Sequence, residues 1–174
     1  CQWHDPAEFW LTSARRAMLA LELAKLLCPE KESECFTGAF LQDMALPILA
    51  CIRMDDYEPI FKIWHLEGGD LAELENDVLE WDHAEVASWI CSEWELPENI
   101  ARAIHNHHDP DTDDDPETLA PVRLVSILRE DESNSGLDEL ILSAQQRYQI
   151  PEEKIESMIE PSFEKARELA RLIV

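Results

Sequence analysis

Apolar residues recur at helical spacing along most of the chain, and no segment alternates between apolar and polar positions as a half-buried strand does. Asp5 suits the N-cap of a first helix, with Pro6 in its first turn and Glu8 reaching back, and Pro29 marks its end. The pattern predicts a helix over 6–28. One face of that helix carries the apolar residues Trp10, Ala14, Ala17, Leu21, Ala24 and Cys28.

Shorter helices are predicted through the rest of the chain from the same periodicity and from the positions of proline. They cover 34–44, a helix from Pro47, 58–65, 71–80, 118–128, a helix from Leu137, one from Pro151 and one from Pro161 to the end. Pro161 is expected to divide the last two. The fold class that follows is all-α, a compact multi-helix bundle.

Two consecutive helices stand out because both place histidines on their inward faces. Asp82 is a predicted N-cap, with Glu85 in the capping-box position. The inward face that follows is His83, Val86, Ala87, Ile90 and Trp94. Pro97 opens the next helix, whose inward face is Ile100, Ile104, His107 and His108.

The charge of the chain excludes some partners. It carries 38 acidic and 14 basic residues, for a formal net charge of −24. Such a surface repels nucleic-acid phosphates and anionic membranes alike. The longest apolar run, 44–52, is interrupted by Pro47 and is far shorter than the roughly 20 residues of a membrane span. Neither nucleic acid nor a membrane is therefore expected as a partner.

Cysteines and tryptophans are expected to serve packing. The chain has five cysteines without a CxxC pair, so a disulfide or zinc framework is disfavoured, and Cys28, Cys51 and Cys91 are interpreted as small buried hydrophobes. The six tryptophans are interpreted as anchors of the core and of helix contacts. The acidic stretch 109–117 is interpreted as a solvated loop, because it lacks the spacing and glycine of a calcium loop.

A series of short motifs runs through the chain in a fixed order. They are FWLTS at 9–13, FLQD at 40–43, HAEVASW at 83–89, Trp94, Leu96 with Pro97, Ile100, the pair His107 and His108, and APVRLV at 120–125. In this order and spacing the region from Phe9 to about Leu128 resembles an HDOD domain, the HD-related output domain of bacterial signalling proteins. The resemblance implies an all-α fold of HD-domain type. It also implies that 1–130 form an HD-like core lacking the family's N-terminal half, with 131–174 as a C-terminal helical extension packed on the same domain.

The related HD and HD-GYP phosphohydrolases use a first-helix His, a His-Asp pair, further histidines and a late Asp to hold one or more metal ions. Carried over by the resemblance, the first-helix His falls on Thr12, the pair on Gln42 and Asp43, and the late Asp near Ser126. Threonine and glutamine lack the basic nitrogen of imidazole, so a binuclear site is not expected.

Asp43, His83, His107 and His108 remain as a reduced set of donors. Three imidazoles and a carboxylate suit a single divalent metal such as iron, zinc or manganese. The other interpretation, which the sequence favours, has half-buried histidines hydrogen-bonded to protein partners, with no metal, no cofactor and no catalytic residue. Spacing alone does not decide between them, because a metal site requires convergence in space.

Two functions follow from these interpretations. The first is a non-catalytic regulatory module of bacterial signal transduction, a degenerate HD-type scaffold that acts on a signalling protein or a fused signalling domain. The alternative is a metal-dependent phosphohydrolase or phosphodiesterase with a single-metal site at Asp43, His83, His107 and His108. Self-association through exposed apolar helix faces is a further expectation if a missing half normally covers Trp10 or Trp89.

Overall fold

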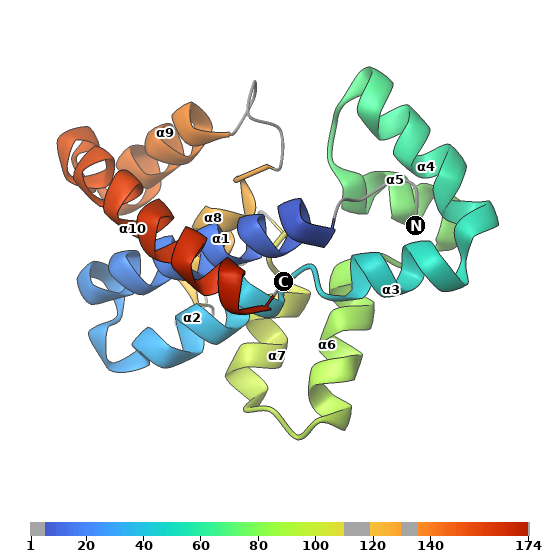
Figure 1. Ribbon diagram of the computed structural model, residues 1–174, viewed down its shortest axis with the longest axis horizontal. Coiled ribbons are helices and arrows are strands. Elements are labelled where there is room, and N and C mark those ends of the chain that lie inside the picture. The colour runs from blue at the N-terminus through green and yellow to red at the C-terminus, as the bar shows by residue number, and fades with distance from the viewer. Residues whose placement is uncertain (1–5, 110–118, 130–135, 174) are drawn as a thin grey trace.

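A computed structural model describes residues 6–109, 119–129 and 136–173 (Figure 1). Within these ranges the chain is all-α and has no strand, as predicted. The elements are α1 (Pro6–Leu27), the 3-10 turn η1 (Pro29–Lys31), α2 (Glu32–Leu41), α3 (Ala45–Ile52), α4 (Met54–Glu67), α5 (Leu71–Leu79), α6 (His83–Glu93), α7 (Glu98–His105), α8 (Ala120–Ser126), α9 (Leu137–Tyr148) and α10 (Glu152–Ile173). The predicted loop over 109–117 lies outside the described residues except for Asp109.

The helices surround two separate hydrophobic clusters. One lies among α1, α2, α8, α9 and α10, with Leu19, Leu23 and Val122 at its centre. The other lies among α3 to α7 and includes Tyr57 and Phe61. Figure 1 shows the first group at the left, α3 to α5 at the right, and the α6–α7 hairpin below. Side chains from both groups of helices can therefore come together at the segments that join the two groups.

Capping residues explain where the central helices begin. The Asp82 side chain accepts a hydrogen bond from the backbone N–H of Glu85 at 2.9 Å, which confirms the predicted N-cap of α6. Asp70 caps α5 in the same way through Ala72. These two caps fix the chain on either side of α5, and α5 ends just before the residues that begin α6.

Three helix boundaries that were predicted from the positions of prolines were wrong. Pro161 does not divide the last helices, because α10 continues through it. The helix predicted over 58–65 begins at Met54 with Pro59 inside it, and the helix predicted from Pro47 begins at Ala45. Pro47 is tolerated because the first turn of a helix has unbonded N–H groups in any case.

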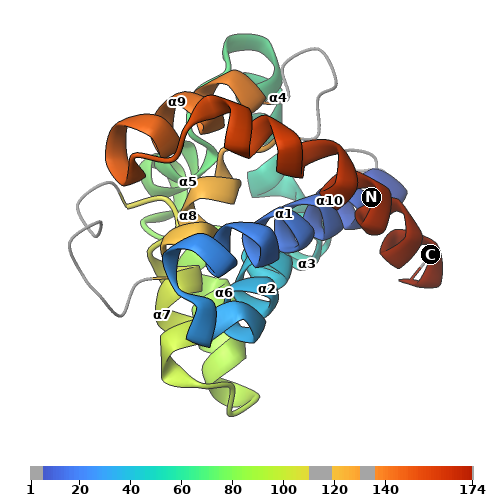
Figure 2. The same ribbon diagram turned by 90° about the vertical axis from the view of Figure 1, so that its left-hand side faces the viewer.

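Helix α10 packs along α1, far away in sequence. Ala166 and Ala170 lie against the buried Ala14, and small side chains allow this close approach. Lys165 adds a surface ion pair to Glu22 at 3.1 Å. Figure 2, turned by 90°, shows α10 running beside α1 toward the C-terminus.

Two packing predictions were wrong in part. Trp89 and Trp94 are 55% and 61% exposed, so neither is a core anchor, because both project from the outer side and the end of α6. Cys51 is exposed on the outer side of α3, whereas Cys91 is buried as predicted.

The stretch Pro29–Ile52 is apolar and long enough by composition to cross a membrane, although 56% of its most apolar window is buried. It is divided into η1, α2 and α3, and residues such as Cys35, Ala39 and Leu49 contribute to the two cores. A core helix of a soluble protein passes the same compositional test, so the stretch is weak support for a membrane span.

Candidate metal centre

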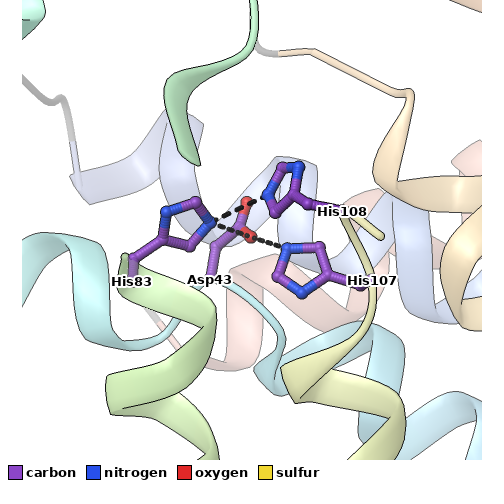
Figure 3. A group of neighbouring side chains, drawn as sticks. All are labelled: Asp43, His83, His107 and His108. Atoms are coloured by element: carbon purple, nitrogen blue, oxygen red, sulfur yellow. Dashed lines mark hydrogen bonds and ion pairs between the residues drawn. The ribbon is translucent and has the colours of Figure 1, made fainter. Parts of the chain in front are cut away.

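Four side chains from three segments meet where the two helical groups join. Asp43 lies in the turn between α2 and α3, His83 is the first residue of α6, and His107 and His108 follow the end of α7. Each offers one donor atom, and the four atoms lie within 4.8 Å of one another. Figure 3 shows the three imidazole rings gathered around the Asp43 carboxylate. The structure thus brings together the reduced donor set found in the sequence.

The donor atoms are spaced as ligands of one ion would be. The two Nε2 atoms of His83 and His108 are 3.0 Å apart. Asp43 Oδ1 is 3.2 Å from His107 Nε2 and 3.5 Å from His83 Nε2. Zinc bonds to nitrogen and oxygen are about 2.0–2.2 Å long, so two ligands of one ion lie roughly 3–4 Å apart. These distances therefore fit an ion at the common centre.

His83 is held from behind by a buried carboxylate. Its Nδ1 lies 2.6 Å from Glu75 Oε2, which also accepts the His83 backbone N–H at 2.9 Å. Glu75 is fully buried, and its other oxygen accepts a hydrogen bond from the Tyr57 hydroxyl at 2.8 Å. A carboxylate on the far nitrogen of a histidine orients the ring and raises its basicity toward a metal. This arrangement turns His83 Nε2 toward the centre.

His107 bears most directly on what the centre could hold. Its Nδ1 lies 2.5 Å from the Ile104 carbonyl, so Nδ1 donates and carries the proton. Burial and the neighbouring His108 lower the pKa of His107 to about 4, so the ring is neutral and Nε2 is a bare lone pair. That buried Nε2 has no hydrogen-bond partner and faces a carboxylate oxygen of Asp43. Two acceptors that face each other in a buried site are explained by a cation between them.

The remaining two donors also have outer partners. His108 Nδ1 lies 3.4 Å from Asp70 Oδ1, and the same Asp70 caps α5. Asp43 Oδ2 pairs with Arg16 of α1, whose guanidinium also donates to the Leu128 carbonyl. Asp43 Oδ1 is left facing the histidines. All four donors therefore have an outer partner, a feature typical of metal sites.

Two opposing effects set the charges of Asp43 and His83: burial favours the neutral forms, and the neighbouring side chains favour the charged forms. Burial by itself raises the pKa of Asp43, but Arg16, His107 and His83 hold it well below its usual range. Burial by itself lowers the pKa of His83, but hydrogen bonds to Asp43 and Glu75 outweigh burial and raise it to about 10. Without an ion, His83 is thus an imidazolium between two carboxylates, and metal binding would displace its proton.

The positions aligned with the missing HD ligands supply no donor of comparable strength. Thr12 and Gln42 are 2% and 1% exposed, and neither the Thr12 hydroxyl nor either amide atom of Gln42 has a hydrogen-bond partner. Ser126 lies against the site through a 3.2 Å hydrogen bond from its hydroxyl to the His107 carbonyl. The donors that remain therefore fit one ion and not two.

A cavity of about 610 Å³ opens beside the centre. It includes all four donors and extends toward α8 and α9. Four arginines line it, namely Arg16, Arg123, Arg129 and Arg147. Four side chains that could hold a metal ion, beside a cavity lined by arginines, form a class of site that is suited to small anionic ligands.

The comparisons with known proteins establish the family and the fold. The HDOD domain model matches residues 2–110, which is more than half of the chain, and the chain belongs to the HDOD family. A solved structure from Shewanella amazonensis SB2B, named "Putative phosphohydrolase", superposes with a TM-score of 0.72 at 18% identity. The match covers 95% of this chain and 65% of that one, and at this identity it shows the HD-type fold alone. No match was found among curated proteins.

Sequence reasoning missed the outer partners of the donors. Glu75 is one acid among many on a helix, and nothing in its spacing separates it from exposed neighbours such as Glu73. Arg16 gave no clear signal either, because the same helix also carries Arg15 and Lys25. The arginines after residue 120 gave none.

Proposed function

We propose that this chain is a regulatory HD-type module of bacterial signal transduction that holds one transition-metal ion at Asp43, His83, His107 and His108. The observation that carries the metal is the bare, buried Nε2 of His107 facing Asp43 Oδ1. A structural histidine network would give this nitrogen a donor, whereas a metal ion satisfies both groups at once.

The four donors narrow the choice of metal ion. Three imidazole nitrogens and one carboxylate oxygen suit zinc, iron or manganese and disfavour calcium and magnesium, which prefer oxygen ligands. When bound, such an ion supplies Lewis-acid polarisation of a phosphoryl oxygen and a lowered pKa for a coordinated water. The chain's own residues hold the donors in place, and Glu75 and Arg16 fix their orientation.

The regulatory part of the proposal is supported by what replaces the other HD ligands. Thr12, Gln42 and Ser126 leave the site without the donors of a second ion, and a second ion is what clamps both oxygens in two-metal phosphoryl transfer. A site of this kind is suited to binding a ligand and changing a contact with a partner protein or a fused domain. Membership of the HDOD family supports this role, and the resemblance to that family leads us to expect that the protein acts in the cytoplasm.

The test is an assay of the metal-loaded protein against an activated phosphodiester such as bis(p-nitrophenyl) phosphate. The regulatory proposal predicts hydrolysis no faster than that of His83→Ala, although the wild type contains one equivalent of metal. Hydrolysis that is lost in His83→Ala would contradict the regulatory role and leave the metal site standing.

A second candidate is a single-metal phosphohydrolase on the same site. It is favoured by the basic cavity, because arginines beside a metal are suited to a phosphate ester. It predicts turnover in the same assay, with His107→Ala abolishing activity and the surface variant His65→Ala leaving it unchanged.

A further inference from the structure

Three arginines form one wall of the cavity, and we call Arg123, Arg129 and Arg147 the arginine wall. They are notable in a chain with 14 basic residues against 38 acidic ones. Of the acids that line the cavity, Asp43 and Asp70 are already engaged by Arg16 and His108, and Glu139 lies 3.9 Å from Arg129. Among the residues that the structure describes, the lining of the cavity is thus more basic than the molecule as a whole, which favours anions there.

The wall is held in place by packing between α8 and α9. Arg123 lies on α8, Arg129 follows that helix, and Arg147 lies in the last turn of α9. Gly136 caps α9 with a φ of 74° and lies so close to the Ile127 carbonyl that a Cβ would clash with it. This close approach fixes the start of α9 against the end of α8.

An aromatic ring lies among the charges. Tyr148 lines the cavity at the end of α9. Burial raises the pKa of Tyr148, and the positive charges of Arg123 and Arg147, which line the same cavity, oppose that rise. The opposite side of the cavity is formed by Trp64, Gly69 and Leu71. A ligand between these sides meets positive charge, apolar surface and aromatic surface together.

The arginine wall lies outside residues 2–110, which are the residues that the family model matches. The family model ends at 110, whereas the whole arginine wall and Tyr148 come after 120. Arg123 lies in the segment 120–125 that resembles the family, whereas Arg129, Arg147 and Tyr148 come after the region of resemblance. These last three residues are a property of this chain's own C-terminal segment.

We propose that the arginine wall binds the phosphate group of a phosphate monoester that also carries an aromatic ring and is about the size of a nucleoside monophosphate. Planar guanidinium groups match phosphate oxygens in pairs, which favours a phosphate over a carboxylate of lower charge. The volume of about 610 Å³ is within the range of small-molecule sites. Trp64, Leu71 and Tyr148 supply surface for the ring of the ligand. The inference rests on the proposed metal site in one respect: an ion bound at the four donors would add positive charge to the same cavity.

Calorimetric titration of the metal-loaded protein tests this, with the four common nucleoside 5′-monophosphates as probes and the unphosphorylated nucleosides as controls. The expected result is that at least one monophosphate binds ten times or more tightly than its nucleoside. Arg147→Gln and Arg123→Gln should each weaken that binding by about tenfold or more, because a charge-assisted hydrogen bond is lost. Arg167→Gln on the outer surface of α10, paired with Glu160, is the matched control and should change nothing.

Metal content, measured on the same samples, separates this inference from the proposed function. If one equivalent of metal is present and no monophosphate binds better than its nucleoside, the arginine wall is not a phosphate site and the metal proposal stands. If the monophosphates bind, the wall variants lose them and no metal is found, the wall is supported and the metal proposal fails. Binding that survives in both Arg123→Gln and Arg147→Gln overturns the wall.

Discussion

Two groups of residues differ in how they are fixed from outside the centre: the histidine side, which carries the donors, and the unpartnered side, which is aligned with missing ligands. On the histidine side, His83 and His108 are backed by carboxylates, and the outer nitrogen of His107 is fixed by a carbonyl. On the unpartnered side, Thr12 and Gln42 are buried, yet their polar side-chain atoms have no partner. The difference indicates that the histidine side is built to hold something, whereas the other side keeps polar residues where a ligand function is absent.

The largest effect is expected from removing the central imidazole. His83→Ala leaves Glu75 and Asp43 buried without their shared partner, and breaking a buried ion pair in this way costs about 3–5 kcal/mol. Urea unfolding measures the loss. The control His65→Ala removes an exposed histidine from α4 and should stay within about 0.5 kcal/mol of the wild type. Equal effects of the two changes would mean that the histidine side is not specially organised.

The second largest effect is expected from adding metal, which should stabilise the protein through the donors of the histidine side. An ion at 100 times its dissociation constant should add about 2.7 kcal/mol to the free energy of unfolding. For a chain of this size that raises the melting temperature by about 5–10 °C. Thermal scans with chelator, zinc, manganese or ferrous iron measure the shift. His107→Ala should abolish it, and a shift of the same size in that variant would contradict the donor set.

The outer carboxylate should matter less than a donor does. Glu75→Gln keeps the shape of the side chain and removes the charge behind His83, so metal affinity should fall about 10–100-fold. Competition with a chromophoric chelator measures the affinity. Glu73→Gln, on the exposed face of the same helix, is the matched control. No difference between the two variants would show that Glu75 does not orient His83.

The smallest effect is expected on the unpartnered side. Thr12→Val replaces a buried hydroxyl that has no partner with a methyl group of similar size, and should stabilise the protein by about 1 kcal/mol. Thr37→Val is the control, because the Thr37 hydroxyl donates to the Ser33 carbonyl and its loss should be neutral or slightly destabilising. Urea unfolding compares them. Marked destabilisation by Thr12→Val would indicate that this hydroxyl has a partner after all.

The sequence predicted most of the fold because its helices carry local signals. The Asp82 N-cap of α6 and the apolar face of α1 needed no tertiary information. The errors at Pro59 and Pro161 have one cause: both prolines lie inside helices, where the surrounding packing offsets the loss of a single backbone hydrogen bond. Exposure of Trp89 and Trp94 was missed because composition favours burying tryptophan whatever its position on the helix.

The candidate site was less predictable because its partners come from distant elements. The four donors were found through their spacing and the family resemblance. Glu75, Arg16 and Asp70 were not, since Glu75 and Asp70 reach the site from α5 and its N-cap and Arg16 reaches it from α1. None of the three has a local pattern that separates it from surface charges. Whether histidines form a network or a metal site depends on which nitrogen of His107 is bonded, and only three-dimensional structure specifies that.

The central claim is one metal ion at Asp43, His83, His107 and His108, and elemental analysis tests it most directly. The protein would be expressed and purified without an affinity tag or chelator, together with His107→Ala and the control His65→Ala. The account predicts about one equivalent of zinc, iron or manganese in the wild type and in His65→Ala, and almost none in His107→Ala. Folded wild-type protein with no stoichiometric metal, even after incubation with each ion, would contradict it.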